Sequence, residues 1–190
     1  MTDPDTSSAA GPRSRRGLLA LAGALALAAG AAWQWRSRRG ESPAGDPAEQ
    51  QALAQVWGLV LKTPQGEDLA LGRFQGQPLL VNFWATWCPP CVREMPTLQR
   101  FHQAQAGRGV HVLGLAIDGP TPVREFLGKV PVDYAIALAG LDGTELVRAL
   151  GNTQGGLPFT LLVDAKGRIR RRKLGEVQFE ELQAWARELA

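Results

Sequence analysis

The sequence predicts an α/β domain in which a central mixed β-sheet is flanked by helices. Short, almost continuous apolar segments indicate strands that are buried on both faces. Between them lie segments whose apolar residues recur every three or four positions, as in amphipathic helices. These segments alternate as strand, helix, strand and helix, and the chain then ends with a hairpin and a last helix. Such an order is typical of a sheet that combines parallel and antiparallel strands.

The first half of the predicted domain begins with a hairpin. Residues 56–61 and 68–71 are short apolar segments on either side of a turn with the sequence TPQG. Residues 78–84 follow as an almost continuous apolar strand, and residues 89 to about 106 form the first long helix. A second buried strand is expected over residues 109–117.

The second half continues with short elements and ends on an amphipathic helix. Thr121 and Pro122 open a short helix, with threonine as its N-cap and proline at its first helical position. The next elements are an extended segment, a short helix, two strands around the turn AKG and a closing helix, over residues 133–138, 144–150, 158–164, 168–174 and 178–189. The last strand carries the run RIRRRK, which is typical of an edge strand that resists pairing. A surface for nucleic acid or lipid headgroups is the alternative interpretation of this run.

The first 40 residues differ from the rest of the chain in charge. They hold six arginines and two aspartates, which leaves 15 basic and 16 acidic residues in the remainder. The basic character of the whole chain therefore belongs to its N-terminal part. A nucleic-acid-binding surface on the folded part, and a nucleic-acid partner, are not expected.

An apolar segment near the N-terminus predicts a membrane anchor. Residues 17–35 contain no charged side chain and would span roughly 28 Å as a helix, enough to cross the hydrocarbon core of a bilayer. Trp33 and Trp35 fit an interfacial position, which favours an uncleaved signal anchor. A cleaved signal peptide, also in its twin-arginine form, and a buried core helix are the alternatives. Four regions are expected, namely a basic leader, the anchor, a Pro/Gly/Ala-rich linker and the α/β domain, over residues 1–16, 17–35, 36–54 and 55–190.

Both cysteines lie in one C-x-x-C motif, at the junction between a predicted strand and the helix that follows it. Cys88 would begin this helix, where unpaired backbone N–H groups and the positive end of the helix dipole stabilise a thiolate. Cys91 lies one turn further on, close enough for the two sulfurs to form a disulfide. Pro89 and Pro90 fit the first helical positions, which need no N–H donor. A stabilised thiolate beside a second thiol is what thiol–disulfide exchange requires.

The segment VNFWATWCPPC, over residues 81–91, and the Leu157–Pro158 dipeptide in the later segment GGLPFTLLVD resemble the thioredoxin superfamily. The closer similarity is to its membrane-anchored branch, which includes TlpA and ResA, and it covers residues 55–190. This resemblance implies a thioredoxin-like fold with an N-terminal β-hairpin extension. It also implies a redox-active Cys88–Cys91 pair that works without a cofactor.

The resemblance implies a role for each site residue. Cys88 is the expected exposed nucleophile that attacks a substrate disulfide, and Cys91 is the resolving thiol that releases the mixed disulfide. Glu94 corresponds to an acidic residue one turn beyond the second cysteine, where a carboxylate tunes thiol acidity or relays a proton. Pro158 corresponds to a cis-proline that faces the dithiol. Substrate contacts are expected from the residues around these positions, namely Trp87, Pro89, Leu157 and Pro158.

One position departs from the thioredoxin pattern. Thioredoxins carry a buried aspartate six residues before the first cysteine, and this chain has Asn82 there. Because asparagine does not titrate, a proton relay must use another group, for which Glu94 is the candidate. This difference favours the TlpA/ResA-like branch over a general cytosolic thioredoxin.

Taken together, these residues predict a membrane-tethered thiol–disulfide oxidoreductase whose domain faces the bacterial periplasm. The family branch mostly supplies reductants, so the expected substrates are disulfides in exported proteins such as apocytochrome c or copper-site proteins. A membrane electron-relay protein is the expected source of electrons, and the chain is expected to be a monomer. The alternative is that the signal segment is cleaved and that the domain is a soluble periplasmic protein.

Other functions remain as alternatives for the same residues. An inert structural disulfide is not favoured, because closing so short a loop removes little entropy from the unfolded chain. A zinc site would need His102 and His111 to converge on the sulfurs, and neither lies at ligand spacing. A thiol peroxidase usually carries Thr or Ser three residues before its reactive cysteine, where this chain has Ala85. A redox-inert module that binds a metal or a partner is the remaining alternative.

Overall fold

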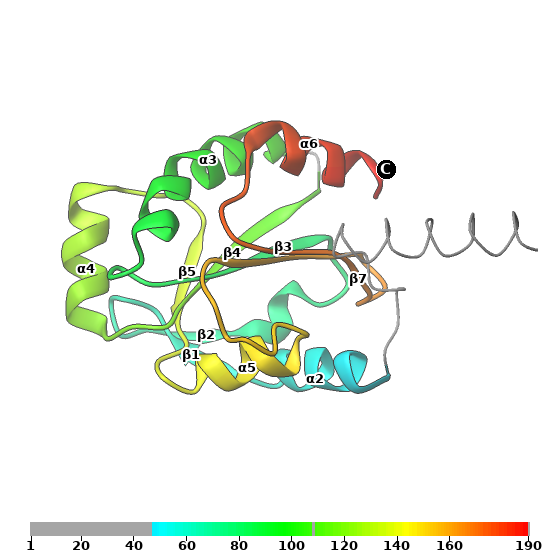
Figure 1. The fold of residues 1–190 in the computed structure, drawn as a ribbon, viewed down its shortest axis with the longest axis horizontal. Coiled ribbons are helices and arrows are strands. Elements are labelled where there is room, and N and C mark those ends of the chain that lie inside the picture. The colour runs from blue at the N-terminus through cyan, green and yellow to red at the C-terminus, as the bar shows by residue number, and fades with distance from the viewer. Residues whose placement is uncertain (1–46, 108, 190) are drawn as a thin grey trace, which may run out of the picture. The chain divides into compact units, whose positions relative to one another are not determined.

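The fold is an α/β sandwich built on one mixed sheet. A computed structural model describes residues 47–107 and 109–189. Within these residues, seven strands form one sheet in the order β2-β1-β5-β4-β3-β6-β7, and helices lie on both of its faces (Figure 1). The predicted central mixed sheet flanked by helices is therefore confirmed.

Three parallel strands form the centre of the sheet. These are β3, β4 and β5, over Leu79–Trp84, His111–Ala116 and Ala135–Leu138. The helix α3 (Pro89–Gln105) connects β3 with β4, and α4 (Pro120–Lys129) connects β4 with β5. Every residue of β3 is buried, because helices cover this strand on both faces of the sheet.

Antiparallel strands extend the sheet on both sides. On one side β6 (Phe159–Val163) pairs with β3, and β7 (Ile169–Leu174) pairs with β6 at the edge. On the other side β1 (Val60–Lys62) pairs with β5 and with β2 (Asp68–Ala70), and a short 3-10 helix, η1 (Leu71–Phe74), follows. The predicted N-terminal hairpin and the basic edge strand are both confirmed, although the first hairpin strand begins at Val60 and not at residue 56.

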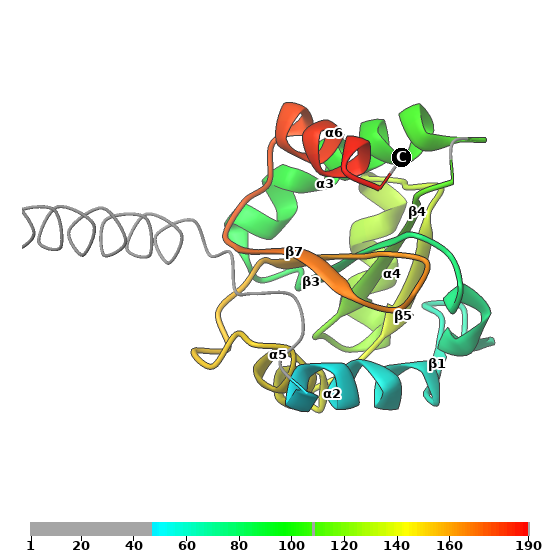
Figure 2. The same ribbon diagram turned by 90° about the vertical axis from the view of Figure 1, so that its right-hand side faces the viewer.

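Each face of the sheet buries its own apolar cluster. The helices α2 (Pro47–Trp57) and α5 (Gly143–Ala149) cover one face, and α3, α4 and α6 (Phe179–Arg187) cover the other (Figures 1 and 2). Along β3 the side chains alternate between these clusters, so that Val81 and Phe83 belong to the first and Leu80 and Trp84 to the second. By the same alternation Asn82, between Val81 and Phe83, faces the layer that contains α3.

The predicted linker over residues 36–54 is wrong in its C-terminal part. Residues 47–54 belong to α2, in which Ala52, Leu53 and Val56 are buried against the first apolar cluster. An alanine-rich segment has the composition of a spacer but also a high helix propensity, and the buried positions hold this one on the sheet.

The predicted start of α4 is also displaced. Gly119 is the N-cap, where Thr121 was expected, and Pro120 is the first helical residue, where Pro122 was expected. Both prolines lie in the first turn of the helix, where a missing N–H leaves no hydrogen bond unmade. The earlier proline therefore determines where the helix begins.

The predicted leader and signal anchor, residues 1–16 and 17–35, lie outside the described residues, as do residues 36–46 of the linker. Among the helices formed by residues 47–107 and 109–189, none is both long enough and apolar enough to cross a bilayer. The prediction of a membrane anchor therefore rests on the N-terminal sequence alone.

Candidate active site

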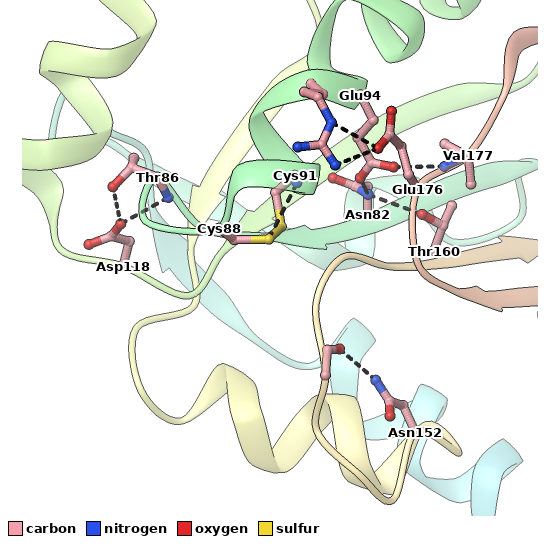
Figure 3. The surroundings of a disulfide bond; sticks show 12 residues. Asn82, Thr86, Cys88, Cys91, Glu94, Asp118, Asn152, Thr160, Glu176 and Val177 are labelled. Atoms are coloured by element: carbon pink, nitrogen blue, oxygen red, sulfur yellow. Dashed lines mark hydrogen bonds and ion pairs between the residues drawn. A yellow bond between two sulfur atoms is a disulfide. The ribbon is translucent and has the colours of Figure 1, made fainter.

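The two cysteines form a disulfide at the start of α3, where the chain leaves β3 (Figure 3). Their Sγ atoms are 2.02 Å apart and their Cα atoms 5.3 Å apart. Cys88 is the N-cap of α3, and its Sγ accepts a hydrogen bond from the backbone N–H of Cys91 at 3.3 Å. Pro89 and Pro90 occupy the first two helical positions, as predicted. A thiolate at Cys88 would therefore lie against a backbone donor and the positive end of the helix.

The sulfurs are less accessible than the resemblance implied. Cys88 was expected to be an exposed nucleophile, but in the disulfide form its residue is only 4% exposed, and Cys91 is fully buried. Both belong to the apolar cluster beneath α3, which explains their low exposure. Cys88 is still the more accessible of the two, and Trp87 beside it is 65% exposed. The exposed residues directly next to Cys88 in the chain are Trp87 and Pro89.

A carboxylate from the neighbouring strand connection holds the loop that leads to Cys88. Asp118 follows β4, and its Oδ2 accepts hydrogen bonds from the backbone N–H of Thr86 at 3.1 Å and from Thr86 Oγ1 at 2.5 Å (Figure 3). Its Oδ1 accepts from the backbone N–H of Gly119 at 2.7 Å. The sequence analysis did not predict this contact. An aspartate that follows a buried parallel strand lies at the carboxyl ends of the strands, and the cysteine loop also begins there.

The Leu157–Pro158 peptide bond is cis, as the resemblance implied. Phe159 pairs with Phe83, so Pro158 lies beside the end of β3 from which the cysteine loop leaves. Pro158 is buried, and Leu157 is partly buried and packs against both apolar clusters. Asn152, which the sequence did not single out, donates from Nδ2 to the carbonyl oxygen of Gly156 at 2.7 Å and so supports the segment before the proline (Figure 3).

Glu94 is a buried carboxylate inside the helical layer, and not a surface residue. It is 1% exposed, and both of its oxygens accept hydrogen bonds (Figure 3). Oε1 accepts from Asn82 Nδ2 at 2.8 Å, and Oε2 accepts from the backbone N–H of Val177 at 2.9 Å. Asn82 Nδ2 also donates to Thr160 Oγ1 at 3.0 Å. Strands β3 and β6 and the segment before α6 thus meet at this carboxylate.

The surroundings of Glu94 raise its pKa to about 7. Burial is the largest cause, because it disfavours the charged form, and the neighbouring charge of Glu176 adds to it. The hydrogen bonds from Val177 and Asn82 and the charge of Lys173 act in the opposite direction. Because Glu94 lies three residues after Cys91, both are on the same side of α3. A group of this pKa can accept or release a proton at neutral pH.

An ion pair connects the start of α3 with the segment that contacts Glu94. Arg93 donates from Nε and Nη2 to Glu176 Oε2 at 3.2 and 3.1 Å. Glu176 precedes Val177, whose N–H contacts Glu94, so the ion pair joins α3 to the segment that lies beside the buried carboxylate (Figure 3). The partners are 83 residues apart in the chain, and no local pattern in the sequence indicates the contact.

The histidines do not join the cysteines. His111 pairs with Leu79 at the start of β3 and so lies at the opposite end of this strand from the cysteine loop. His102 is in the last turn of α3, with its ring centroid 6.0 Å from that of Tyr134. Among the residues that the structure describes, no three His, Cys, Asp or Glu side chains are grouped as metal ligands.

Comparisons with known proteins agree with this site. The family described as redoxin matches residues 43–184. The chain is 27% identical to the sporulation thiol-disulfide oxidoreductase A of Bacillus subtilis, over 77% of this chain and 88% of that protein. It is also 27% identical to the thiol-disulfide oxidoreductase ResA of Bacillus thuringiensis subsp. konkukian, over 69% of this chain and 74% of ResA. A crystal structure of a thioredoxin-related protein from Neisseria meningitidis serogroup B is similar with a TM-score of 0.61 at 30% identity, over 69% of this chain and 98% of that one. The chain belongs to the redoxin family and is a thiol–disulfide oxidoreductase with a thioredoxin-like fold.

Proposed function

We propose that the protein reduces disulfides in exported proteins, with Cys88 as the attacking sulfur, Cys91 as the resolving sulfur and Glu94 as the proton acceptor for Cys91. The observation that carries this proposal is the position of the disulfide at the N-terminus of α3 with a carboxylate of pKa about 7 buried one turn behind it. The helix start stabilises the thiolate that attacks, and the carboxylate exchanges the proton that the second step requires.

The proposed reaction transfers two electrons to the substrate. In the reduced protein, the Cys88 thiolate attacks one sulfur of the substrate disulfide. The substrate S–S bond breaks, a mixed disulfide with Cys88 forms, and the released substrate thiolate takes a proton from water. Cys91 then gives its proton to Glu94 and attacks Cys88 Sγ. The mixed disulfide breaks, the Cys88–Cys91 disulfide forms, and the second substrate thiolate leaves and is protonated.

The substrate contacts in this proposal are the residues around the disulfide. Trp87 and Pro89 are exposed beside Cys88, and Leu157 is partly exposed before the cis-proline. Pro158 is buried and positions this dipeptide beside the end of β3. An extended segment of the substrate that carries its cysteine would lie between these apolar side chains.

The location and partners belong to the same proposal. The apolar segment 17–35 with its basic leader supports a signal anchor that holds the domain in the periplasm, with cleavage to a soluble periplasmic protein as the alternative. The substrates would then be exported proteins such as apocytochrome c or copper-site proteins. A membrane electron-relay protein would reduce the Cys88–Cys91 disulfide again, and the chain would act as a monomer.

Reduction of insulin disulfides in the presence of dithiothreitol tests the proposal. We expect Cys88→Ala to lower the rate to that of dithiothreitol alone, because the attacking sulfur is lost. When Cys91→Ala is first reduced and then mixed with insulin in the absence of dithiothreitol, we expect a mixed disulfide between Cys88 and insulin to accumulate, because the resolving sulfur is lost. Unchanged insulin reduction by Cys88→Ala would contradict the proposal, and rapid consumption of hydrogen peroxide by the reduced protein would indicate a thiol peroxidase instead.

The direction of electron flow requires a separate measurement. The equilibrium of the dithiol with glutathione gives its reduction potential. A reduction potential of about −270 mV, as in thioredoxin, would support a reductant. A reduction potential of about −120 mV, as in strong oxidants, would reverse the proposed direction of electron flow.

A further inference from the structure

Asn82 is a fully buried amide whose two ends have different surroundings. Its exposed fraction is 0%. The Nδ2 group donates to Glu94 Oε1 at 2.8 Å and to Thr160 Oγ1 at 3.0 Å, so both of its hydrogens are used (Figure 3). The Oδ1 atom, in contrast, is buried without a hydrogen-bond partner among the described residues. A buried acceptor without a partner is unfavourable, and its presence beside a titrating carboxylate requires a physical reason.

The contacts of Glu94 match its charged form, because both contacting atoms are donors. Asn82 Nδ2 and the backbone N–H of Val177 are both donors, and a carboxylate can accept from both. A protonated Glu94 must instead donate from its new O–H group to an acceptor. The unpaired acceptor already present on the neighbouring side chain is Asn82 Oδ1. Rotation of the amide by half a turn would bring this oxygen to the place that Nδ2 occupies.

We propose that Asn82 is a positioning residue whose side-chain amide rotates by half a turn when Glu94 gains or loses a proton. The Thr160 hydroxyl forms a hydrogen bond with the amide in both orientations. This inference rests on the proposed role of Glu94 as a proton acceptor. In the carboxylate form, Nδ2 donates to Glu94 and to Thr160, as the structure shows. In the acid form, Oδ1 accepts from the Glu94 O–H and from the Thr160 hydroxyl. Only the proton of Glu94 is added, and no other bond changes than these hydrogen bonds.

Thr160 is suited to this arrangement because a hydroxyl can donate or accept by rotation alone. In each orientation one end of the amide is satisfied twice and the other end has no partner. The unpaired end is the Oδ1 atom in the carboxylate form and the NH2 group in the acid form. The protonation state of Glu94 decides between the two orientations. Thr160 lies on β6 two residues after Pro158, so the amide also links the carboxylate with the strand that carries the cis-proline.

Other titratable groups around Glu94 have their own partners. Glu176 is bound to Arg93, and Lys173 on β7 is bound to Glu181. Tyr134, whose pKa is raised by burial and by the charge of Glu94, donates its hydroxyl to Met95 Sδ at 3.3 Å. The two cysteines do not titrate while they form the disulfide. The oxidised protein therefore allows the Glu94 titration to be followed without a change at the sulfurs.

NMR on the full-length oxidised chain, kept in solution with a mild detergent, tests the proposal. The carboxyl carbon of Glu94 reports its protonation, and nuclear Overhauser contacts between the Asn82 Nδ2 protons and the Thr160 side chain report the orientation of the amide. We expect these contacts to be present at high pH and to disappear with a midpoint equal to the Glu94 pKa, near 7. Contacts that persist unchanged below this pKa would overturn the proposal.

Two variants sharpen the test. In Glu94→Gln, the new side-chain NH2 group can donate to Asn82 Oδ1, so we expect the low-pH pattern of the wild type at every pH. The same substitution at the exposed Glu180 on α6 is the matched control and should leave the Asn82 titration unchanged. If Glu94→Gln retains the contacts between Nδ2 and Thr160, the amide does not follow the proton.

The outcome is separate from that of the insulin assay. The titration uses the oxidised protein and no substrate, so the amide can turn over even if the protein fails to reduce insulin. In that case the proposed function alone would be wrong. Conversely, insulin reduction through Cys88 with a static Asn82 amide would leave the function intact and overturn only this inference.

Discussion

Glu94 and Asp164 show how the environment of a carboxylate decides its protonation. Both donors to Glu94, an amide and a backbone N–H, are neutral, and burial outweighs them and raises its pKa to about 7. The pKa of Asp164 is lowered. Burial acts to raise this pKa, but the hydrogen bonds from Arg168 and Lys166 and the charge of Arg168 outweigh burial. The buried site thus keeps a proton available at neutral pH, and the surface turn does not.

The raised pKa of Glu94 predicts that the folded protein loses stability as the pH rises. Below its usual pKa of 4.5, the carboxyl is protonated in both the folded and the unfolded chain. Between 4.5 and about 7, the unfolded chain has lost this proton while the folded chain still holds it. We expect the free energy of unfolding of the oxidised protein to fall by roughly 3 kcal/mol over this range through Glu94. Urea unfolding at a series of pH values measures it.

The contribution of Glu94 is isolated by difference. Glu94→Gln has no proton to lose and should lack this part of the pH dependence, whereas Glu180→Gln on the exposed side of α6 should retain it. If the wild type and Glu94→Gln follow the same curve, burial does not hold a proton on this residue.

The edge strand β7 shows what the basic run does in the fold. Three basic residues of β7, and one just before it, bind acidic partners. The pairs are Arg168–Asp164, Arg170–Asp164, Arg171–Glu188 and Lys173–Glu181. Two of these partners lie on or next to α6, so the run connects the sheet edge with that helix. The sheet order places β7 at the edge, as predicted. The four basic side chains form ion pairs with acidic side chains of the same protein.

Substitution of glycine by alanine is expected to have opposite effects on stability at two helical positions. A Cβ atom at Gly143, the first residue of α5, would lie 2.8 Å from Ala139 Cβ and 2.9 Å from Ile117 Cγ1, closer than packing allows. We expect Gly143→Ala to destabilise the protein by about 1–3 kcal/mol. At Gly128 in α4, a Cβ meets nothing within 4 Å, so Gly128→Ala should stabilise the helix by about 0.5–1 kcal/mol. Urea unfolding of both variants compares them, and equal effects would contradict the predicted close approach of α5.

At the scale of the whole molecule, α2 belongs to the folded unit. Among the described residues, contacts group α2 with the sheet and the other helices in one compact unit. The redoxin family matches residues 43–184, a span that includes α2. The first apolar cluster needs α2, because its Ala52, Leu53 and Val56 cover the same face of the sheet as α5. The boundary of the domain therefore precedes this helix.

Two truncations test this boundary. We expect residues 43–190 to unfold within about 0.5 kcal/mol of the full-length chain, because no described core contact is removed. We expect residues 58–190, which lack α2, to lose at least about 3 kcal/mol, because Leu53 and Val56 no longer cover the cluster. Urea unfolding of the three proteins measures the difference. Equal stability of the two truncated proteins would mean that α2 adds nothing to the fold.

Local patterns in the sequence were sufficient for most of the fold. Period and composition predicted β3, α3, β4, the β6–β7 hairpin and α6, because an apolar strand or an amphipathic helix shows its buried face in its own residues. The C-x-x-C motif predicted the dithiol at a helix start for the same reason. Local patterns missed α2, since an alanine-rich segment is equally compatible with a spacer until a sheet is there to bury it. They also missed the short 3-10 helix η1.

The amino-acid sequence by itself determined which chemistry this protein carries, since Cys88, Cys91 and the prolines between them make their redox site within one turn of chain. Only the tertiary structure decided how that site handles protons. Asn82 meets Thr160 across 78 residues, Val177 meets Glu94 across 83, and Asp118 meets Thr86 across 32. A pKa near 7 at Glu94 results from burial by elements that are distant in the chain. Burial and long-range hydrogen bonds exist only once the sheet and its helices have assembled, so no local pattern can specify them.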